Sequence, residues 1–327
     1  MNGKILKMKE IGGFIEFERY SDNMLHKNGV KLNCGRNCLA YVFKVKKISK
    51  IYLPYFLCDS IEKICKKYNV KCNFYHIDEK FRPIINDIDV NEWVYVVNYY
   101  GQLPREYMNS LYEHHHNIIF DFTQSYYEMP IKNAVTLYSC RKFFGVSDGG
   151  IVYIDTSHFE SLEYDQSFER MHYLMGRFEC GASAFYSEFC NREKEFENEP
   201  IKFMSKLTQN ILCSLDYDCI RKKREKNFEV LEKYLQKFNR LKLVKRDGPF
   251  MYPLWVHNGK NVRKQLIEQK VYIPILWPNV IEKYTRSYLE YDMAENILPI
   301  PCDQRSDEDD MLTICYLIDN FMKERTV

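Results

Sequence analysis

The sequence predicts an α/β protein with a mostly parallel β-sheet and helices on both faces of that sheet. Two observations predict this class. Strand-like apolar segments alternate with helix-like segments between residues 35 and 154, and repeated β-α-β units form parallel sheets. The length of 327 residues is enough to bury a large core and favours a second domain.

Helical and extended patterns follow one another through the first half of the chain. Residues 57–68 predict a helix because their apolar side chains recur on one helical face. The apolar run at residues 93–97 predicts a strand. In order, we expect a helix at 35–47, a strand at 50–54, a helix at 57–68, strands at 70–77 and 92–100, a helix at 105–115, and strands at 117–121, 134–139 and 150–154.

The second half of the chain begins with a helical, polar stretch from residue 159 to about residue 213. A long charged helix at 217–238 follows and is expected to lead into a smaller α+β domain. This domain would comprise strands near 242–245 and 251–257 and helices at 262–269 and 307–323. The predicted division is an N-terminal segment at 1–30 that packs on the domains, a large domain at 31–215 and a small domain at 216–327.

Composition and charge are those of an ordinary globular protein, with 46% hydrophobic and 28% charged residues. The net charge of +2, from 47 basic and 45 acidic residues, gives no field that favours nucleic acid or an anionic membrane as partner. No apolar run approaches the roughly 20 residues that span a bilayer, and the N-terminus has no signal-peptide core. We therefore expect a cytoplasmic protein.

The cysteine and histidine patterns do not predict a metal site. Twelve cysteines are present without a Cys-x-x-Cys pair, so we expect reduced and mostly buried thiols. The histidines at 114–116 follow a polar helix-like stretch, where a solvated turn is the simpler interpretation.

The strongest chemical signal is a lysine and an aspartate that each follow an apolar strand. Lys142 lies three residues after Ser139, and Asp121 ends the apolar run at residues 118–120. A lysine at the end of a buried strand can lose its proton in apolar surroundings and attack a carbonyl carbon. An enzyme that holds pyridoxal phosphate needs such a lysine for its Schiff base and a carboxylate for the protonated pyridine nitrogen.

Two further features place a ligand near these residues. Gly35 begins a predicted helix, and the free N–H groups and dipole of a helix start favour a phosphate. Ligands of parallel sheets bind at the carboxyl ends of the strands, where Asp121, Ser139 and residues 99–101 all fall. Each residue alone has a structural explanation, since many helices begin after glycine and an aspartate often caps a turn.

The order of these motifs resembles that of the DegT/StrS-type sugar aminotransferases, a branch of the fold-type I pyridoxal-phosphate enzymes, over nearly the whole chain. The resemblance implies that family's fold, with a seven-stranded, mostly parallel sheet. The matching segments are a small-residue phosphate turn at 34–39, a loop that supplies a stacking aromatic at 53–58, an aromatic-Gly-Gln segment at 97–104, an Asp-x-x-Gln motif at 121–125, a Ser…Lys…Gly-Gly segment at 139–150, and substrate-side loops at 272–278 and 298–309.

The resemblance also implies roles for individual residues. Lys142 would form the Schiff base and then move the proton, while Asp121 would keep the pyridine nitrogen protonated. Gln124 would contact the phenolic oxygen or the ring of the cofactor. The phosphate would be bound by the backbone of Gly35 and Arg36 and by the Ser139 hydroxyl, and Phe56, or less securely Tyr55, would stack on the ring.

Several of these residues have a second interpretation. Phe56 can be a core residue, and Arg36 can contact substrate or pair with a surface acid. Tyr99, Trp277 and Arg305 are candidate substrate-side residues. Arg224 and Asn227 also match the family, although a solvated helix face explains them equally well.

The function that this resemblance implies is amino transfer to a keto sugar. The expected substrate is a nucleotide-linked 4-keto-6-deoxyhexose in the biosynthesis of surface polysaccharide or lipopolysaccharide, with glutamate as amino donor and a homodimer as the assembly. The Ser139-to-Lys142 spacing is three residues, where many family members have five. In this the chain resembles a shorter branch of the family, for which it is open whether the substrate pocket binds a nucleotide. The alternatives are a pyridoxal-phosphate enzyme for a small keto acid or amino acid, and a non-catalytic regulator with the same fold.

Overall fold

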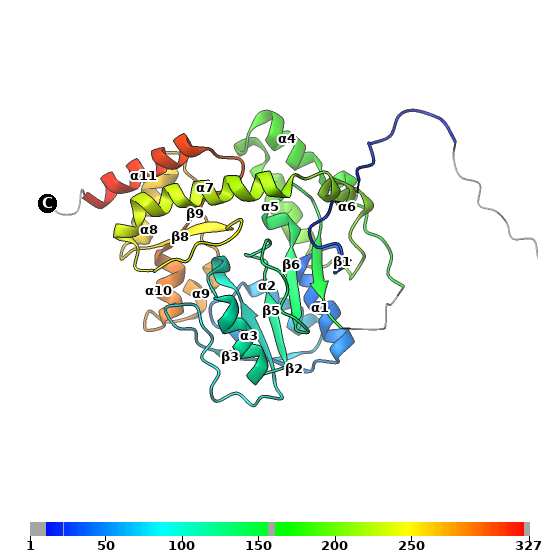
Figure 1. Ribbon diagram of the computed structural model, residues 1–327, viewed down its shortest axis with the longest axis horizontal. Helices are drawn as coiled ribbons and strands as arrows, with labels where there is room; N and C mark the ends of the chain where they lie inside the picture. Colours follow the sequence, from blue (N-terminus) through cyan, green and yellow to red (C-terminus); the bar gives the residue numbers. More distant parts are fainter. Residues whose placement is uncertain (1–10, 22, 156–160, 324–327) are drawn as a thin grey trace, which may run out of the picture.

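The computed structural model describes residues 11–21, 23–155 and 161–323, and its largest element is one seven-stranded sheet (Figure 1). The strand order is β1-β7-β6-β5-β4-β2-β3. The five strands from β6 to β3 are parallel, whereas β7 runs antiparallel to both of its neighbours. The prediction of a mostly parallel seven-stranded sheet is confirmed. The strands are β1 (Val30–Leu32), β2 (Lys50–Pro54), β3 (Lys71–Tyr75), β4 (Trp93–Val97), β5 (Ile118–Asp121), β6 (Val135–Ser139) and β7 (Gly150–Tyr153).

Helices cover both faces of this sheet because its crossovers run in opposite directions. The connection from β2 to β3 moves toward one edge of the sheet, and the connection from β4 to β5 moves toward the other. Right-handed crossovers of opposite direction place their helices on opposite faces, so α2 (Asp59–Lys67) and α3 (Arg105–His114) lie on different sides. Helix α1 (Gly35–Lys46) packs beside α2. The chain reverses its direction of travel between β4 and β2, which is where ligands of open α/β sheets bind.

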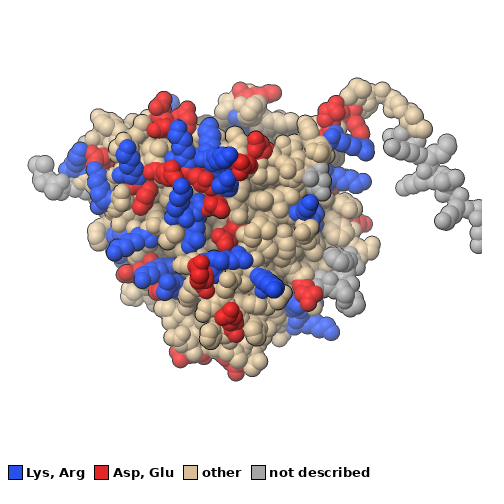
Figure 2. All heavy atoms as spheres, in the orientation of Figure 1, with Lys and Arg blue, Asp and Glu red and all other residues tan. Residues whose placement is uncertain are grey.

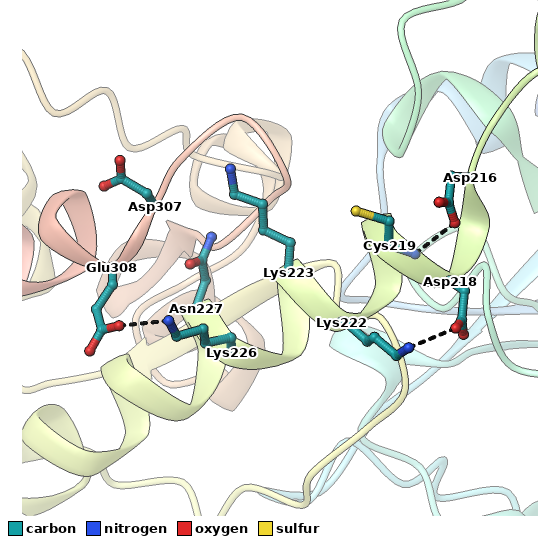
Figure 3. Close-up of a pocket in the computed structure, with 9 residues that line it drawn as sticks. All are labelled: Asp216, Asp218, Cys219, Lys222, Lys223, Lys226, Asn227, Asp307 and Glu308. Carbon is teal, nitrogen blue, oxygen red and sulfur yellow. Dashed lines mark hydrogen bonds and ion pairs between the residues drawn. The ribbon is translucent and has the colours of Figure 1, made fainter.

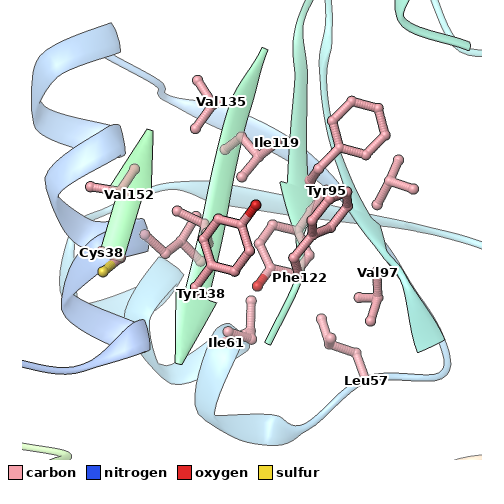
Figure 4. Packing of buried hydrophobic residues seen from close by; sticks show 14 of the residues in the cluster. Cys38, Leu57, Ile61, Tyr95, Val97, Ile119, Phe122, Val135, Tyr138 and Val152 are labelled. Atoms are coloured by element: carbon pink, nitrogen blue, oxygen red, sulfur yellow. The ribbon is translucent and has the colours of Figure 1, made fainter. Parts of the chain in front are cut away.

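The main core lies between the sheet and the helices α1 and α2 (Figure 4). Cys38 of α1 and Ile61 of α2 pack toward the sheet residues Tyr95 and Ile119, whereas Tyr138 points to the other face of the sheet. These side chains are all buried, and removing apolar surface of this kind from water is the dominant stabilising term in folding.

A second, smaller core forms around a two-stranded antiparallel sheet, β8 (Met251–Trp255) and β9 (Ile297–Pro301). Helices α7 (Tyr217–Leu235), α8 (Gly259–Glu268) and α11 (Glu308–Lys323) supply its other apolar side chains. Residues of α9 (Pro278–Lys283) and α10 (Leu289–Asn296) instead join the main core. Because the C-terminal part contributes to both cores, the predicted boundary between residues 215 and 216 stays a prediction.

The helical stretch between the two sheets contains α4 (His172–Cys180), α5 (Tyr186–Glu195) and α6 (Lys206–Cys213). The helices predicted at 35–47, 57–68, 105–115, 217–238 and 307–323 are confirmed with small shifts at their ends. The beginning of the predicted helical stretch, at residues 159 and 160, lies outside the described residues. In the described ranges, no helix has the length and hydrophobicity needed to cross a membrane.

The predicted strand at 242–245 is wrong. The segment Lys-Leu-Val-Lys has two apolar residues at its centre, but it is not part of either sheet. The side chain of Gln102 takes the place of a neighbouring strand, because its Oε1 accepts from the Val244 amide at 2.8 Å and its Nε2 donates to the Val244 carbonyl at 3.2 Å. A side chain that supplies both a donor and an acceptor can satisfy an extended backbone without a strand partner.

The N-terminal segment is described from residue 11. Ile11 and Phe14 are almost fully exposed, at 95% and 96%. Further along, Tyr20 donates its amide to Asn210 at 2.9 Å, and His26 is fully buried against Tyr138. Within residues 11–21 and 23–30, the contacts with the rest of the protein thus lie toward the C-terminal end of the segment.

Candidate active site

Three neighbouring parallel strands bring the predicted catalytic residues to one edge of the large sheet. Val97 at the end of β4 is opposite Asp121 at the end of β5, and Asp121 is opposite Leu137 of β6. Ser139 ends β6, and Lys142 lies in the single 3-10 turn that follows directly. The structure therefore places Asp121, Ser139 and Lys142 together, although 21 residues separate the aspartate from the lysine in the sequence.

The carboxylate of Asp121 is buried and fixed by two donors. Tyr95 donates its hydroxyl to Oδ2 at 2.8 Å, and Thr123 donates its amide to Oδ1 at 2.8 Å. Only 6% of Asp121 is exposed. Burial and the nearby Asp121 carboxylate raise the pKa of Tyr95 well above its ordinary value, so this tyrosine remains a hydrogen-bond donor. These two hydrogen bonds fix the carboxylate in one orientation.

The amine of Lys142 contacts protein atoms, and solvent still reaches its side chain. Its Nζ donates to Thr123 Oγ1 at 2.9 Å, and the Phe250 ring lies 5.9 Å away. Burial lowers the pKa of Lys142, and Arg36 lowers it further, whereas the Asp121 carboxylate opposes both effects. A lowered pKa increases the fraction of neutral amine, which is the nucleophilic form.

Thr123 links the two catalytic candidates. Its backbone amide holds Asp121 and its hydroxyl accepts from Lys142. The sequence indicated only that Thr123 lies inside the Asp-x-x-Gln motif, and gave no reason to assign it a role. The structure makes it the residue that sets the position of the lysine relative to the aspartate.

The start of α1 lies against the end of β6. A Cβ atom on Gly35 would lie 3.8 Å from both Ser139 Cβ and Thr123 Cγ2. On the other side, a Cβ on Gly150 would lie 2.6 Å from the backbone carbon of Cys34. Only glycine allows this close approach, which explains the second glycine of the Asp-Gly-Gly turn. The predicted phosphate residues Gly35 and Ser139 are thereby adjacent to Thr123.

Arg36 pairs with an acidic side chain that the sequence did not identify. Glu193, near the end of α5, accepts from Arg36 Nη2 at 3.5 Å through Oε2 and from Arg141 Nη2 through Oε1. Arg141 lies between Ser139 and Lys142 in the chain, so both arginines flank the predicted phosphate position. Of the interpretations left open for Arg36, the structure shows the one in which its side chain pairs with an acid.

Phe56, Tyr99 and Trp277 form one aromatic cluster beside the site. The Phe56 ring lies 4.2 Å from that of Trp277 and 5.2 Å from that of Tyr99, measured between centroids. All three are buried, and Tyr99 donates its hydroxyl to the Phe56 carbonyl. Gln124 accepts from the Tyr100 amide at 2.7 Å. The contacts with cofactor or substrate expected of these four residues stay predictions.

Arg305 is exposed and forms a two-pronged ion pair with Asp303, with both distances at 2.7 Å. Arg177 of α4 lies near enough for Arg305 to lower its pKa, after the larger effect of burial. The charge of Arg305 is therefore balanced by Asp303, and its role toward substrate stays a prediction.

Arg224 and Asn227 are buried, so the solvated helix face is the wrong interpretation for both. Arg224 donates to the side chain of Gln304 and to the backbone carbonyls of Pro249, Phe250 and Phe143. Asn227 donates to carbonyls of the segment between β9 and α11. The two residues connect α7 to the loop after Lys142 and to the C-terminal part.

A separate surface pocket of about 550 Å³ lies between α7 and the start of α11 (Figure 3). Its lysines and acids pair with one another, as Lys222 does with Asp218 at 2.9 Å and Lys226 with Glu308 at 2.8 Å. Basic and acidic side chains are mixed over the face that carries α7 (Figure 2). No lining residue of this pocket belongs to the predicted site, and its paired charges show no preference for one sign of ligand.

The parallel sheet, the antiparallel return of β7 after the lysine and the smaller C-terminal sheet define the fold of the fold-type I pyridoxal-phosphate enzymes. Among solved structures, the chain has the fold of DegT/StrS-type sugar aminotransferases. No protein-family model and no curated protein matches the sequence. The predicted resemblance is therefore confirmed at the level of the fold.

Three solved structures illustrate the match. A DegT DnrJ EryC1 StrS aminotransferase from Brucella abortus is 13% identical, with a TM-score of 0.59 over 89% of this chain and 85% of that chain. The sugar aminotransferase CalS13 from Micromonospora echinospora is 14% identical, with a TM-score of 0.61 over 89% and 86%. Spr1654 from Streptococcus pneumoniae, in its PMP form, is 10% identical, with a TM-score of 0.61 over 90% and 88%.

Proposed function

We propose that this protein is a pyridoxal-phosphate-dependent aminotransferase that transfers an amino group to a keto sugar. The observation that carries the proposal is the Asp121–Thr123–Lys142 arrangement, in which a buried carboxylate and an amine of lowered pKa meet at adjacent strand ends. The fold that the chain shares with CalS13 and with the PMP form of Spr1654 supports the same class of chemistry.

The described residues fit pyridoxal phosphate. The cofactor needs an amine, a carboxylate for its ring nitrogen and donors for its phosphate. Lys142 supplies the amine and Asp121 the carboxylate, which two donors hold in one orientation. Ser139 and the start of α1 at Gly35 supply donors beside two arginines. All three requirements are met within one edge of the sheet.

When bound, pyridoxal phosphate supplies an electron-accepting ring that stabilises negative charge at the substrate carbon. Asp121 would hold a proton at the ring nitrogen. Lys142 would hold the cofactor and then carry a proton at Nζ to and from the substrate carbon. Thr123 would orient Nζ, and the aromatic cluster of Phe56, Tyr99 and Trp277 would exclude water from one side of the site.

We propose a nucleotide-linked 4-keto-6-deoxyhexose as substrate and glutamate as donor, in the biosynthesis of surface polysaccharide. The cationic groups around the site favour anionic reactants of this kind. Arg36 and Arg141 flank the helix start, where both guanidinium groups face the single carboxylate of Glu193. Arginine pairs well with carboxylates and phosphates because its planar donors match their oxygens.

We also propose that the protein acts as a homodimer. Large apolar side chains are exposed on the N-terminal segment and on α4 and α5, with Phe14 at 96%, Phe178 at 91% and Tyr186 at 65%. Exposed apolar surface of this kind marks sites of association. Light scattering after gel filtration should give twice the mass of one chain, and Phe178→Asp should lower it. A wild-type protein that stays monomeric at micromolar concentration would contradict this part of the proposal.

The test of the proposed chemistry is covalent. Purified protein incubated with pyridoxal phosphate and then reduced with borohydride should retain the cofactor on the peptide that contains Lys142. Lys142→Ala should retain none, whereas Lys223→Ala, which changes a lysine of the remote pocket, should behave as wild type. A wild-type protein that takes up no cofactor would overturn the proposal. A panel of keto sugars and keto acids, assayed with glutamate, then distinguishes the sugar substrate from a small keto acid, and absence of any transfer indicates a regulator.

A further inference from the structure

Two arginines and one glutamate meet beside the start of α1. Arg36 and Arg141 each donate to a different oxygen of Glu193. Their side chains are 19% and 13% exposed, against 33% for the glutamate. The cluster joins three separate elements, namely α1, the turn that carries Lys142, and α5.

The cluster holds more positive charge than its carboxylate can neutralise. Two guanidinium groups face one carboxylate, and Arg36 Nη1 and Arg141 Nε are buried without a hydrogen-bond partner among the described residues. Burial lowers the pKa of Arg141, and the charge of Arg36 contributes a smaller effect in the same direction. Unpaired buried donors cost free energy, so a ligand with more oxygens and a second negative charge would satisfy this cluster better than Glu193 does.

The position of the cluster favours a phosphate in particular. Arg36 is in the first turn of α1, where the helix dipole is positive. Gly35 brings that turn to within van der Waals distance of Ser139. A phosphate placed between the two arginines would therefore also be near a helix start and a serine at a strand end.

Glu193 can leave this position at low cost. Every residue of α5 is at least partly exposed, so moving the helix would uncover little apolar surface. The nearby Phe196 is buried, but it follows the helix, and its ring lies between the guanidinium groups of Arg141 and Arg170, at 4.4 Å and 5.3 Å. That contact keeps Arg141 in place when the carboxylate moves away.

We propose that Arg36 and Arg141 form a binding site for a doubly charged phosphate group, and that Glu193 occupies this site as an internal counter-ion until phosphate displaces it. The phosphate comes either from the cofactor or from a nucleotide-linked substrate. That choice rests on the proposed function, whereas the anion site itself does not.

Calorimetric titration with inorganic phosphate tests the site directly. Glu193→Gln removes the competing charge, and we expect phosphate to bind on the order of tenfold more tightly, which corresponds to about 1.4 kcal/mol. Arg141→Gln should weaken binding by about tenfold or more, because it removes a charged donor. In the double variant the gain from Glu193→Gln should disappear. Should Arg141→Gln not fold, the comparison of wild type with Glu193→Gln still decides the outcome.

Glu188→Gln is the matched control, because Glu188 lies on the same helix but pairs with His172 and Arg192. If Glu193→Gln binds phosphate no more tightly than Glu188→Gln, the proposal is overturned.

Two probes in a Lys142→Ala background, which cannot bond covalently to the cofactor, identify the source of the phosphate. Tighter binding of pyridoxal phosphate in the Glu193→Gln variant assigns the site to the cofactor, and tighter binding of uridine diphosphate assigns it to the substrate. If neither probe binds more tightly in the Glu193→Gln variant, the proposal is overturned. Failure of wild type to bond with the cofactor, with the phosphate response intact, would count against the proposed function alone.

Discussion

Lys142 and Arg224 are both cations with protein acceptors, and they differ in exposure and in the number of acceptors that the protein supplies. Arg224 is 1% exposed and donates to four acceptors, with its guanidinium 4.7 Å from the centre of the Phe143 ring. Lys142 is open to solvent and donates to a single hydroxyl. A cation whose donors are used by the protein stabilises the fold, and a cation whose donors are mostly unused can take part in chemistry.

The two cations are also connected. Arg224 and Gln304 both donate to the carbonyl of Phe143, the residue that follows Lys142. The structural cation therefore fixes the backbone that carries the reactive one. The comparison predicts that substitutions at the two positions separate activity from stability.

The largest expected effect is the loss of amino transfer in Lys142→Ala, by on the order of 10³-fold or more, because the covalent nucleophile and the proton carrier are removed together. The free energy of unfolding should not fall. The folded state lowers the pKa of Lys142, so at a pH below the ordinary lysine pKa the unfolded chain binds more protons than the folded chain. The charged lysine therefore opposes folding at neutral pH. Turnover and urea unfolding check the two parts. A variant that loses stability as well as activity would break the comparison.

Arg224→Ala should show the opposite pattern. It removes the donor of the Pro249 and Phe250 carbonyls and one of the two donors of the Phe143 carbonyl, and we expect a loss of about 3 kcal/mol in the free energy of unfolding. Arg221→Ala is the control, because Arg221 lies on the same helix in partly exposed ion pairs with Asp218 and Glu225, and should cost less than about 1 kcal/mol. Equal losses for the two variants in urea unfolding would contradict the structural role of Arg224.

His26 extends the comparison to a group that is buried in its neutral form. Burial lowers its pKa from 6.5 to about 4. Between these values the unfolded chain binds a proton that the folded chain does not, so stability should fall by about 3 kcal/mol as the pH drops from 6.5 to 4. Urea unfolding over this range measures the slope, and His26→Phe should reduce it. An unchanged slope in His26→Phe would mean that other groups cause the acid sensitivity.

The smallest expected effect is that of Thr123→Val, which keeps the shape of the side chain and removes the acceptor for Lys142. We expect amino transfer to fall by about tenfold, because the amine loses its orientation. The pKa of Lys142 should fall further, since a hydrogen bond from the charged amine no longer favours that form. The pH dependence of acylation at Lys142, followed by mass spectrometry, reports this shift. Unchanged kinetics and pH dependence would show that Thr123 does not position the lysine.

The parts of the fold that the sequence predicts are those governed by local periodicity. Apolar runs located the parallel strands, and stretches with apolar residues on one helical face located the long helices. Strand β9 escaped detection because two of its five residues are proline, and β1 because it has only three residues. The false strand at 242–245 has apolar residues at its centre, but its backbone pairs with the side chain of Gln102, a contact that no local pattern encodes.

The site divides in the same way. Asp121, Ser139 and Lys142 could be placed together because parallel strands end at one edge of a sheet. The contact between Glu193 and Arg141 could not be predicted, because it joins a loop to a helix 52 positions away and Glu193 lies in no motif. Arg224 was left open between two interpretations, since a sequence does not show whether a charged residue on a long helix faces water or protein.

The turn that bears Lys142 is bounded by β6 before it and the Asp-Gly-Gly hairpin behind it, and both are tied to the sheet. Helices α4 and α5, by contrast, lie on the periphery. The backbone that carries the reactive amine is therefore fixed by the large sheet, and α5 reaches the same turn only through the side-chain contact between Glu193 and Arg141. A lysine anchored in this way depends on the sheet rather than on the particular residues of the outer helices, which is compatible with a fold shared with the Brucella abortus protein at 13% identity.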